Sequence, residues 1–500
     1  MAVRREMLMV VSTLLLVVFS AGLQLSTWPV RFRYPGEGAE VEGMCLAEMV
    51  RLRRGEPIYA AASEKGLDAA IYGPLYYLIG ARLVDPDRPA YFPLRFLATL
   101  TTLGCVAMSG WLAFRISRRW LAAALAPLII LSYGIVSLYG TCSRSDSGAL
   151  FLVLAGVLVA YEFRQSARIL FAVPLFILGF FYKQQFVAAP VAVMLFLLFE
   201  RRFRVAAAFA GIMAAGVVGL LALFQFAIFR GQDFFQHFFR YNLVPFSSQL
   251  YMGGFIFFGA LLAVPLLVAF ESLRLHRERF MACYLSVALL SVLLAVGKEG
   301  SNTNYFLECI FVSGALFAAL LASRITEGVQ RLELISLLGV TLFLALLFAP
   351  PPPRALDFIR DRAVQQYLRA NFPPRTPALS YYTGDLVRAG LDTPITDIHQ
   401  YAHLIRAGRL DERPLLTALA RHEFKVILLT FDLQAGTDQV CLKRYLTDAL
   451  AGTIREHYEP VEVLDMPAPQ QYHPEDRFYV WVPRPQSLLA APARDHAAPE

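Results

Sequence analysis

Residues 115–168 read RISRRWLAAALAPLIILSYGIVSLYGTCSRSDSGALFLVLAGVLVAYEFRQSAR, and this stretch decides the fold class. Two apolar runs, Trp120–Tyr139 and Gly148–Phe163, alternate with three polar ones. The outer polar runs are rich in arginine, whereas the middle one contains Arg144 and Asp146. Apolar runs of roughly 20 residues suit helices that cross a bilayer, and cytoplasmic loops carry an excess of basic residues. The stretch therefore predicts two membrane-spanning helices, with Arg144 and Asp146 on the extracytoplasmic side.

The composition extends this prediction to most of the chain. Of the 500 residues, 57% are hydrophobic and 17% are charged, and the mean hydropathy is +0.51. Soluble globular proteins have about 25% charged residues. Six cysteines in a chain of this length also exclude a small disulfide-stabilised scaffold. The sequence is therefore typical of a membrane protein, and not of a disordered chain or a lone soluble enzyme.

The basic residues are distributed as the positive-inside rule requires. Residues 1–350 contain 29 Lys and Arg against 20 Asp and Glu, whereas residues 351–500 contain 17 against 19. The net charge of +7 therefore does not indicate nucleic-acid binding. Basic clusters occur at alternate junctions of the apolar runs and share one side of the membrane if the N-terminus is cytoplasmic. They are Arg4–Arg5, Arg115–Arg119, Arg164–Arg168, Arg201–Arg204, Arg274–Arg279 and Arg324–Arg331.

We predict eleven membrane-spanning helices on this basis. Two assignments depend on the arginines, because either alternative would invert the later clusters. Lys183-Gln184-Gln185 divides an apolar region into two short spans, and Gly73–Val84 is an interfacial helix with Tyr76 and Tyr77 at the headgroup level. The predicted spans are Met7–Val30, Tyr91–Phe114, Trp120–Tyr139, Gly148–Phe163, Ile169–Tyr182, Phe186–Phe199, Val205–Phe229, Tyr251–Phe270, Phe280–Val296, Tyr305–Ala322 and Leu332–Pro350.

The first apolar run has a second interpretation as a cleaved signal peptide, because Arg4 and Arg5 precede it. Its length and its continuation through Trp28 favour a membrane anchor with a cytoplasmic N-terminus. Eleven spans then place the C-terminal region outside the cytoplasm. We expect residues 1–350 to form the transmembrane domain, with residues 31–90 as its first outer loop.

The C-terminal region predicts a small extracytoplasmic α/β domain over residues 351–485, followed by a disordered tail over 486–500. It begins after Pro350–Pro353, which make a stiff exit from the last helix. The predicted strands are Ala378–Tyr382, Lys425–Phe431 and Phe478–Val482, and the predicted helices are Asp357–Asn371, Pro414–His422 and Val440–Arg455.

The loop after the first apolar run carries three close carboxylates, Glu37, Glu40 and Glu42. Neighbouring carboxylates at a membrane surface can act as a general base or bind a divalent metal. The loop by itself is equally consistent with an ordinary solvated acidic turn, because exposed glutamates are common.

Lysines on the same predicted side of the membrane favour a functional site over an ordinary acidic turn. The chain has five lysines, and the three within residues 1–350 are Lys65, Lys183 and Lys298. All three map to the outer side, against the positive-inside trend, although a lysine at a helix end can also simply snorkel. Cations held on the outer side of the membrane indicate a binding site for an anion. A lipid phosphate at the outer leaflet is the natural candidate, with Arg144 as a bidentate donor.

The first outer loop resembles that of the GT-C glycosyltransferases, which include protein O-mannosyltransferases, aminoarabinose transferases and bacterial lipopolysaccharide-core transferases. Glu42 is followed by GEPIY at Gly55–Tyr59 and by YGPLYY at Tyr72–Tyr77. Arg144-x-Asp146, Lys183-Gln184-Gln185 and Asn304-Tyr305-Phe306-Leu307-Glu308 are similar to later motifs of bacterial relatives. The resemblance covers about residues 1–325.

This resemblance implies an inverting transfer from a polyprenyl-phosphate-linked sugar, without a nucleotide sugar. It also implies a location in a bacterial inner membrane, with residues 1–350 as the transmembrane catalytic domain. The catalytic acid is then Glu42, 13 residues before Gly55, or Glu40, 15 residues before it, and Asp146 is the second-loop acid. The implied donor-phosphate ligands are Arg144, Lys183 and Lys298, and the implied substrate-binding residues are Tyr72, Gln184, Gln185, Asn304, Tyr305 and Glu308.

No cofactor is required by this reading, and a divalent metal held by Glu42 and Asp146 stays open. The implied partners are the donor lipid, the bilayer and an acceptor glycan, lipid or protein, with no nucleic acid. The series Asp397-x-His399-x-Tyr401-x-His403 tempts a metal-site interpretation, but no ligand set of recognisable spacing accompanies it, which favours ordinary packing.

Two other functions compete with glycosyl transfer. A secondary transporter also suits eleven spans, but its polar residues gather near the bilayer midplane on broken helices. A polysaccharide ligase or polymerase would use the same kind of lipid-linked donor and would lack the Glu42 loop after the first span.

Overall fold

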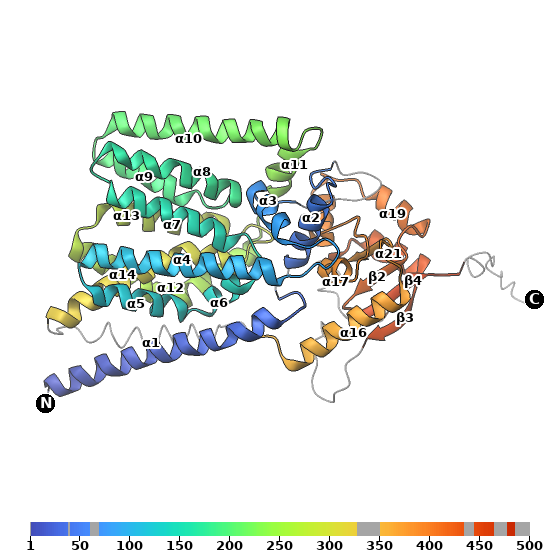
Figure 1. The fold of residues 1–500 in the computed structure, drawn as a ribbon, viewed down its shortest axis with the longest axis horizontal. Coiled ribbons are helices and arrows are strands. Elements are labelled where there is room, and N and C mark those ends of the chain that lie inside the picture. Colours follow the sequence, from blue (N-terminus) through green and yellow to red (C-terminus); the bar gives the residue numbers. More distant parts are fainter. Residues whose placement is uncertain are drawn as a thin grey trace, which may run out of the picture.

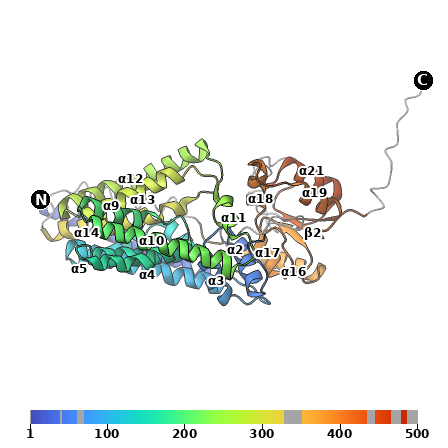
Figure 2. The ribbon, with the colours of Figure 1, turned by 90° about the horizontal axis from the view of Figure 1, so that it is seen from above.

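The computed structural model describes residues 2–38, 41–60, 70–327, 351–434, 445–464 and 478–485. It shows a long bundle of helices with a smaller α/β unit at one end, and the N-terminus lies at the other end (Figures 1 and 2). The short helices α2 (Glu42–Arg53) and α3 (Pro74–Leu83) lie where the bundle meets this unit.

Helices occupy the first ten predicted spans, and the eleventh, Leu332–Pro350, lies outside the described residues. The bundle helices are α1 (Ala2–Arg33), α4 (Phe92–Ser117), α5 (Trp120–Leu131), α6 (Gly134–Thr141), α7 (Asp146–Glu162), η1 (Ala167–Ala172), α8 (Val173–Tyr182), α9 (Ala188–Phe199), α10 (Phe203–Leu223), η2 (Phe224–Ile228), α11 (Phe234–Phe238), η3 (Arg240–Asn242), α12 (Ser248–His276), α13 (Arg279–Ala295), η4 (Thr303–Phe306) and α14 (Leu307–Glu327).

Length and composition allow four of the described helical segments to cross a membrane by themselves. These are Val11–Arg33, Phe92–Ser117, Phe203–Ile228 and Thr303–Ile325. The pair α5 and α6 is a fifth candidate if it forms one broken span. The remaining apolar helices, such as α9, are shorter, so the total of eleven spans stays a prediction.

The third predicted span, Trp120–Tyr139, is not one continuous helix. α5 and α6 meet at an angle of 78°. The break lies at Ser132 and Tyr133, where Tyr133 has an extended backbone and the Ser132 hydroxyl donates to the Leu128 carbonyl at 2.8 Å. The bend has a consequence for the site, because α6 then ends directly before the turn that carries Arg144.

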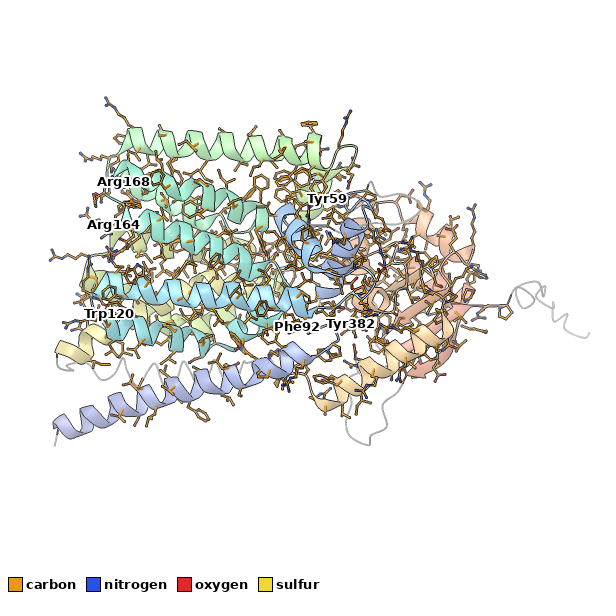
Figure 3. The ribbon with its side chains drawn as sticks, in the orientation of Figure 1. Tyr59, Phe92, Trp120, Arg164, Arg168 and Tyr382 are labelled. Atoms are coloured by element: carbon orange, nitrogen blue, oxygen red, sulfur yellow. The ribbon has the colours of Figure 1, made fainter. Side chains whose placement is uncertain are left out.

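The predicted division at Lys183 is confirmed. α8 ends at Tyr182 and α9 begins at Ala188, so the Lys183–Val187 segment forms a connection between two short helices. Arg164 and Arg168, at the other end of α8, lie at the opposite end of the molecule from Tyr382 of the α/β unit (Figure 3). The basic residues of this junction therefore lie far from the end that carries the polar break.

The predicted interfacial helix is present as α3, but its tyrosines are not at a lipid surface. Tyr76 is 3% exposed and Tyr77 is completely buried. The Tyr76 hydroxyl donates to the Ser143 carbonyl at 2.7 Å, which draws the ring into the protein. At Gly73, before the helix, an added Cβ would lie 2.0 Å from the Phe181 carbonyl oxygen, so only glycine allows α3 to approach α8 this closely.

The C-terminal unit (residues 355–485) contains a four-stranded sheet in the order β1-β2-β4-β3. β1 (Ala378–Ser380) is parallel to β2 (Val426–Leu429), and β4 (Phe478–Pro483) is antiparallel to both β2 and β3 (Tyr458–Leu464). Three strands occur at predicted positions, whereas β3 was not predicted. Its sequence YEPVEVL combines a proline with two glutamates, which is typical of an edge strand.

Helices cover both faces of this sheet. Leu379, Ile427 and Trp481 pack with α18 (Ile398–Arg406), α19 (Arg413–Ala420) and α21 (Asp448–His457). Ala378, Val426, Leu428 and Val480 pack on the other face with α16 (Ala355–Asn371) and α17 (Thr383–Arg388). Successive strand residues therefore point to opposite faces and are buried on both.

The α/β unit is docked on the bundle through a glycine pair. A Cβ added to Gly43 of α2 would lie 2.3 Å from the backbone nitrogen of Gly384 in α17. Around this contact the Thr396 hydroxyl donates to a Glu48 oxygen at 2.6 Å, and Arg51 donates to the Thr393 carbonyl at 2.6 Å. The two elements pack backbone to backbone, which fixes the unit relative to the first outer loop.

We predict that Gly384→Ala destabilises this docking. The added Cβ would lie 1.6 Å from the Tyr91 hydroxyl and 2.9 Å from the Gly43 Cα, and overpacking of this kind costs about 1–3 kcal/mol. Thermal unfolding of the purified protein in detergent should show a lower Tm. Gly452→Ala is the matched control, because nothing lies within 4 Å of the added Cβ on α21. Equal Tm values for the two variants would contradict the close-packing argument.

Candidate active site

A cavity of about 460 Å³ lies between the bundle and the C-terminal unit. Ala288, Val292 and Ala295, spaced along one face of α13, give it an apolar wall. The rest of its lining is largely polar. Nine of the sequence-predicted site residues line it, namely Tyr72, Arg144, Lys183, Gln184, Gln185, Lys298, Asn304, Tyr305 and Glu308.

Asp146 organises the positively charged part of the cavity from behind. Its Oδ1 accepts hydrogen bonds from Lys183 Nζ at 2.5 Å and from Asn304 Nδ2 at 2.7 Å, and its Oδ2 accepts from Arg144 Nε at 3.2 Å. Asp146 is completely buried and does not line the cavity itself. Two cations thus share one carboxylate, so this cluster carries an excess positive charge that suits an anion, although the cavity lining also includes Glu299 and Glu308.

Aromatic rings fix the two cationic side chains. Lys183 Nζ lies 5.1 Å from the centroid of the Tyr72 ring, and Arg144 Cζ lies 5.2 Å from that of Tyr139. Arg144 also donates from Nη2 to the Tyr72 hydroxyl at 3.5 Å. Cations over ring faces are held by the ring quadrupole. The positive groups are therefore ordered in advance of any ligand.

Glu42 is held in a separate hydrogen-bond network, outside the cavity lining. Its oxygens accept five hydrogen bonds: from Gly38 N at 2.6 Å, from Arg95 Nε and Nη2 at 3.0 and 2.6 Å, and from Ser143 N and Oγ at 2.5 and 2.9 Å. Burial alone would raise the pKa of Glu42, but Arg95 and the donors from Ser143 and Gly38 outweigh it and lower the pKa. Glu42 therefore joins α2, α4 and the turn that precedes Arg144.

This geometry bears on the catalytic role expected for Glu42. The carboxylate is fully buried, is not part of the cavity lining and has every oxygen engaged. A group held as an anion by five donors is a poor proton acceptor, and the arrangement suits a positioning role instead. Glu40, the second candidate, lies outside the described residues.

The two residues considered for a metal, Glu42 and Asp146, are each engaged by basic side chains. Glu42 is paired with Arg95, and Asp146 is paired with Lys183 and Arg144. Within the described ranges no group of three or more His, Cys, Asp or Glu residues is placed to hold a metal ion. In the C-terminal series, Asp397 caps α18 by accepting from Gln400 N at 2.9 Å, and Tyr401 packs in the core.

The C-terminal unit contributes to the cavity directly. Gln400 of α18 lines it and donates to the Tyr241 carbonyl at 2.6 Å. Glu299, which follows Lys298 in the cavity lining, has its Oε2 2.7 Å from His403 Nδ1. The cavity is therefore completed by Gln400, which lies 92 positions after Glu308 of α14, the last bundle residue in its lining.

Sequence reasoning missed Arg95, Tyr241 and Gln400. Arg95 carried a signal, because it is an arginine inside the apolar run Tyr91–Phe114, and a charge inside a membrane span marks a functional or structural partner. It is 1% exposed and also donates to the Tyr34 and Gly36 carbonyls at 2.5 and 2.7 Å. Gln400 carried none, since an amide on a short polar helix is unremarkable.

Cys45 and Cys142 are both buried free thiols. They do not form a disulfide with each other. Cys441 lies outside the described residues.

The fold and the cavity together define a class: a helical membrane bundle that presents a partly apolar, positively charged cavity to an α/β unit at its end. No protein-family model matches the sequence, and no curated protein matches it. Solved structures do match. ArnT from Cupriavidus metallidurans in the apo state is 12% identical, with a TM-score of 0.58, covering 93% of this chain and 97% of that one.

A second structure, of the same ArnT bound to undecaprenyl phosphate, is also 12% identical and has a TM-score of 0.57, with the same coverage of both chains. ArnT is an aminoarabinose transferase with a GT-C fold. The chain therefore has the fold of these ArnT structures, which agrees with the GT-C fold that the sequence resemblance implied.

We predict that Glu42→Gln and Arg95→Gln each destabilise the protein, because each leaves a buried charge without its partner. Breaking a buried pair costs about 3–5 kcal/mol. Combining the two substitutions should cost less than the sum of the single losses, measured by chemical unfolding in detergent. Because the pKa of Glu42 is lowered in the folded state, its contribution is fully present at neutral pH and is lost as the pH falls through that lowered value.

Asp411→Asn serves as the control for this experiment. Asp411 pairs with Arg413 at the surface, where both side chains are exposed, so its loss should change stability by at most about 1 kcal/mol. Additive effects of the two buried substitutions would show that the Glu42 and Arg95 side chains do not depend on each other.

Proposed function

We propose that the protein is an inverting glycosyltransferase of the inner membrane that moves a sugar from a polyprenyl-phosphate-linked donor to an extracytoplasmic acceptor. The observation that carries this proposal is a single cavity in which Arg144, Lys183 and Lys298 gather beside an apolar wall. A lipid phosphate has both matching parts: an anionic head for the cations and a hydrocarbon chain for α13. The ArnT structure bound to undecaprenyl phosphate supports the same ligand class here.

In the proposed reaction an acceptor hydroxyl attacks the anomeric carbon from the side opposite the phosphate. The new carbon–oxygen bond forms as the bond from that carbon to the phosphate oxygen breaks, which inverts the anomeric centre. The hydroxyl proton leaves to a carboxylate, and negative charge grows on the polyprenyl phosphate. Arg144, Lys183 and Lys298 are placed to stabilise this charge, and fixed donors in a site shielded from water are effective at doing so.

The other residues of the cavity are assigned to substrate contact. Tyr72, Gln184 and Gln185 lie beside the cations, and Asn304, Tyr305 and Glu308 lie on or next to α14. Gln184 Nε2 donates to the Ile71 carbonyl at 2.7 Å, which orients its amide at the cavity. Asn304 donates a hydrogen bond to Asp146, which also pairs with Arg144 and Lys183. It thereby links the residues assigned to substrate contact with the cations.

Glu42 then acts by position. It holds the backbone and hydroxyl of Ser143, the residue before Arg144, so loss of its carboxylate would move the guanidinium that meets the phosphate. We assign proton abstraction to Glu40, the first-loop alternative to Glu42 that the sequence left open.

The distribution of charge argues against the transporter alternative. Arg144, Lys183 and Lys298 lie at helix ends beside the C-terminal unit, whereas a transporter would place such groups near the centre of the bundle. A polysaccharide ligase or polymerase would share the donor and is separated from our proposal by the acceptor alone.

We predict that Lys183→Met lowers transfer by about 10²–10³-fold, because removal of one preorganised donor to a developing anion has an effect of this size. Purified protein would be incubated with defined polyprenyl-phosphate sugars, and mass spectrometry would quantify the released polyprenyl phosphate and the glycosylated product. The matched control is Lys425→Met, which removes an exposed lysine from the C-terminal unit. Wild-type release rates in the Lys183 variant would rule out its role at the phosphate.

We predict that a topology reporter fused at Pro353 gives an extracytoplasmic signal. This residue precedes α16 of the C-terminal unit, which borders the cavity. A second fusion at Arg201, in the connection from α9 to α10, should give a cytoplasmic signal. A cytoplasmic signal at Pro353 would place the cavity on the side that lacks the proposed acceptors.

A further inference from the structure

Four turns of the bundle lie at the end opposite the C-terminal unit (Figure 1). They connect α4 to α5, α7 to η1, α9 to α10 and α12 to α13. Figure 3 shows Trp120, Arg164 and Arg168 at this end, away from Tyr382 of the C-terminal unit. The turns and the residues beside them contain ten arginines and three glutamates, within residues 115–119, 161–168, 199–204 and 277–279. This end of the bundle therefore carries a strong excess of positive charge.

Side-chain contacts join the four turns into one surface. The contacts are those of Arg115 with Glu162, of the Tyr161 hydroxyl with Glu278 at 2.8 Å, and of Arg279 with Glu200 at 3.3 Å. Each of the three glutamates thus already has a partner within the surface. The glutamates hold the turns together, and they leave most of the arginines without an anion.

Six arginines of this surface are exposed, and their side chains have no partner among the residues that the structure describes. We call them the arginine rim, which consists of Arg118, Arg119, Arg168, Arg201, Arg204 and Arg277. A guanidinium offers five N–H donors in a planar fork that matches the oxygens of a phosphate or carboxylate. The rim is therefore a set of strong donors for anionic groups that the protein itself does not supply.

Three rim arginines have a backbone conformation that favours glycine. The φ angle is 59° at Arg118, 55° at Arg201 and 54° at Arg277. Arg118 and Arg277 follow the last residues of α4 and α12, where a left-handed residue is usually glycine because a Cβ is unfavourable there. A cation at a helix C-terminus also interacts well with the helix dipole. The backbone alone would favour glycine at all three positions, so the charged side chain has a function of its own.

Exposed aromatic side chains lie next to the rim. Trp120 follows Arg119 and is 69% exposed. Phe199 and Phe203, on either side of Arg201, are 72% and 62% exposed. Aromatic residues beside arginines suit the boundary between lipid headgroups and acyl chains, where the rings are buried and the charges meet phosphates. These rings favour a membrane as the anionic partner over an acidic protein in water.

We propose that the arginine rim binds the headgroups of anionic phospholipids in the leaflet that faces away from the cavity. Phosphate oxygens accept hydrogen bonds from the guanidinium groups, and the neighbouring aromatic side chains lie among the upper acyl chains. No residue of the rim lines the large cavity. The inference therefore rests on the bundle crossing a membrane and is independent of the proposed transfer reaction.

The test measures lipid binding to the full-length protein in an uncharged detergent by native mass spectrometry. We expect the wild type to bind phosphatidylglycerol roughly ten-fold or more tightly than phosphatidylcholine, because several arginines act together. Arg118→Gly, Arg201→Gly and Arg277→Gly should each weaken phosphatidylglycerol binding about five-fold and leave phosphatidylcholine binding unchanged. Arg375→Gly is the matched control, because Arg375 is exposed and left-handed, with φ of 63°, but belongs to the C-terminal unit. It should bind both lipids as the wild type does.

Thermal unfolding in the same detergent separates lipid binding from a role at the helix ends alone. Without lipid, the three glycine variants should keep the wild-type Tm or exceed it, because glycine adopts a positive φ without strain. Phosphatidylglycerol should then raise the Tm of the wild type more than that of the variants. A Tm that falls equally with and without the lipid would overturn the proposal, as would equal binding of the two lipids by the wild type. Binding of poly-glutamate without binding of phosphatidylglycerol would overturn it in favour of an acidic protein partner.

Discussion

The buried carboxylate of Glu42 is the constraint on which the rest of this structure depends. It ties together three segments that are distant in the sequence: the first outer loop, α4 through Arg95, and the turn at Ser143. A buried anion is tolerated only when it is paired and fully hydrogen-bonded, and five donors meet this requirement here. The position of Arg144 therefore depends on the hydrogen bonds between Ser143 and Glu42, which is not part of the cavity lining.

The cations of the cavity are stable for a related reason. Arg144 and Lys183 are 8% and 5% exposed, and cations at such depth need compensation. Asp146 supplies one negative charge for the two, and rings of Tyr72 and Tyr139 supply weaker electrostatic attraction. Compensation is incomplete, so the site keeps an excess positive charge that an anionic ligand would neutralise. Incomplete pairing is costly to folding and is the feature that distinguishes a binding site from a structural ion pair.

The sequence predicted the helices well because charge at the helix ends is a local signal. The arginines correctly divided the chain at Lys183, although the two short helices on either side are poor candidates by length. The bend between α5 and α6 was missed, although Pro127 inside α5 and Gly134 at the start of α6 are both local signals for a break. Tyr76 was misplaced at the lipid surface because its partner, the Ser143 carbonyl, is 67 residues away and is invisible to any local pattern.

The candidate site shows the same division between local and distant information. Residue types that suit a phosphate were recognisable at Arg144 and Lys183, but the expected catalytic role of Glu42 rested on spacing within one loop, and its partner Arg95 lies 53 residues further on. The involvement of α18 could come only from the fold. Gln400 lines the cavity from α18 and donates to the Tyr241 carbonyl, so the C-terminal unit is part of the proposed site and not an appendage to it.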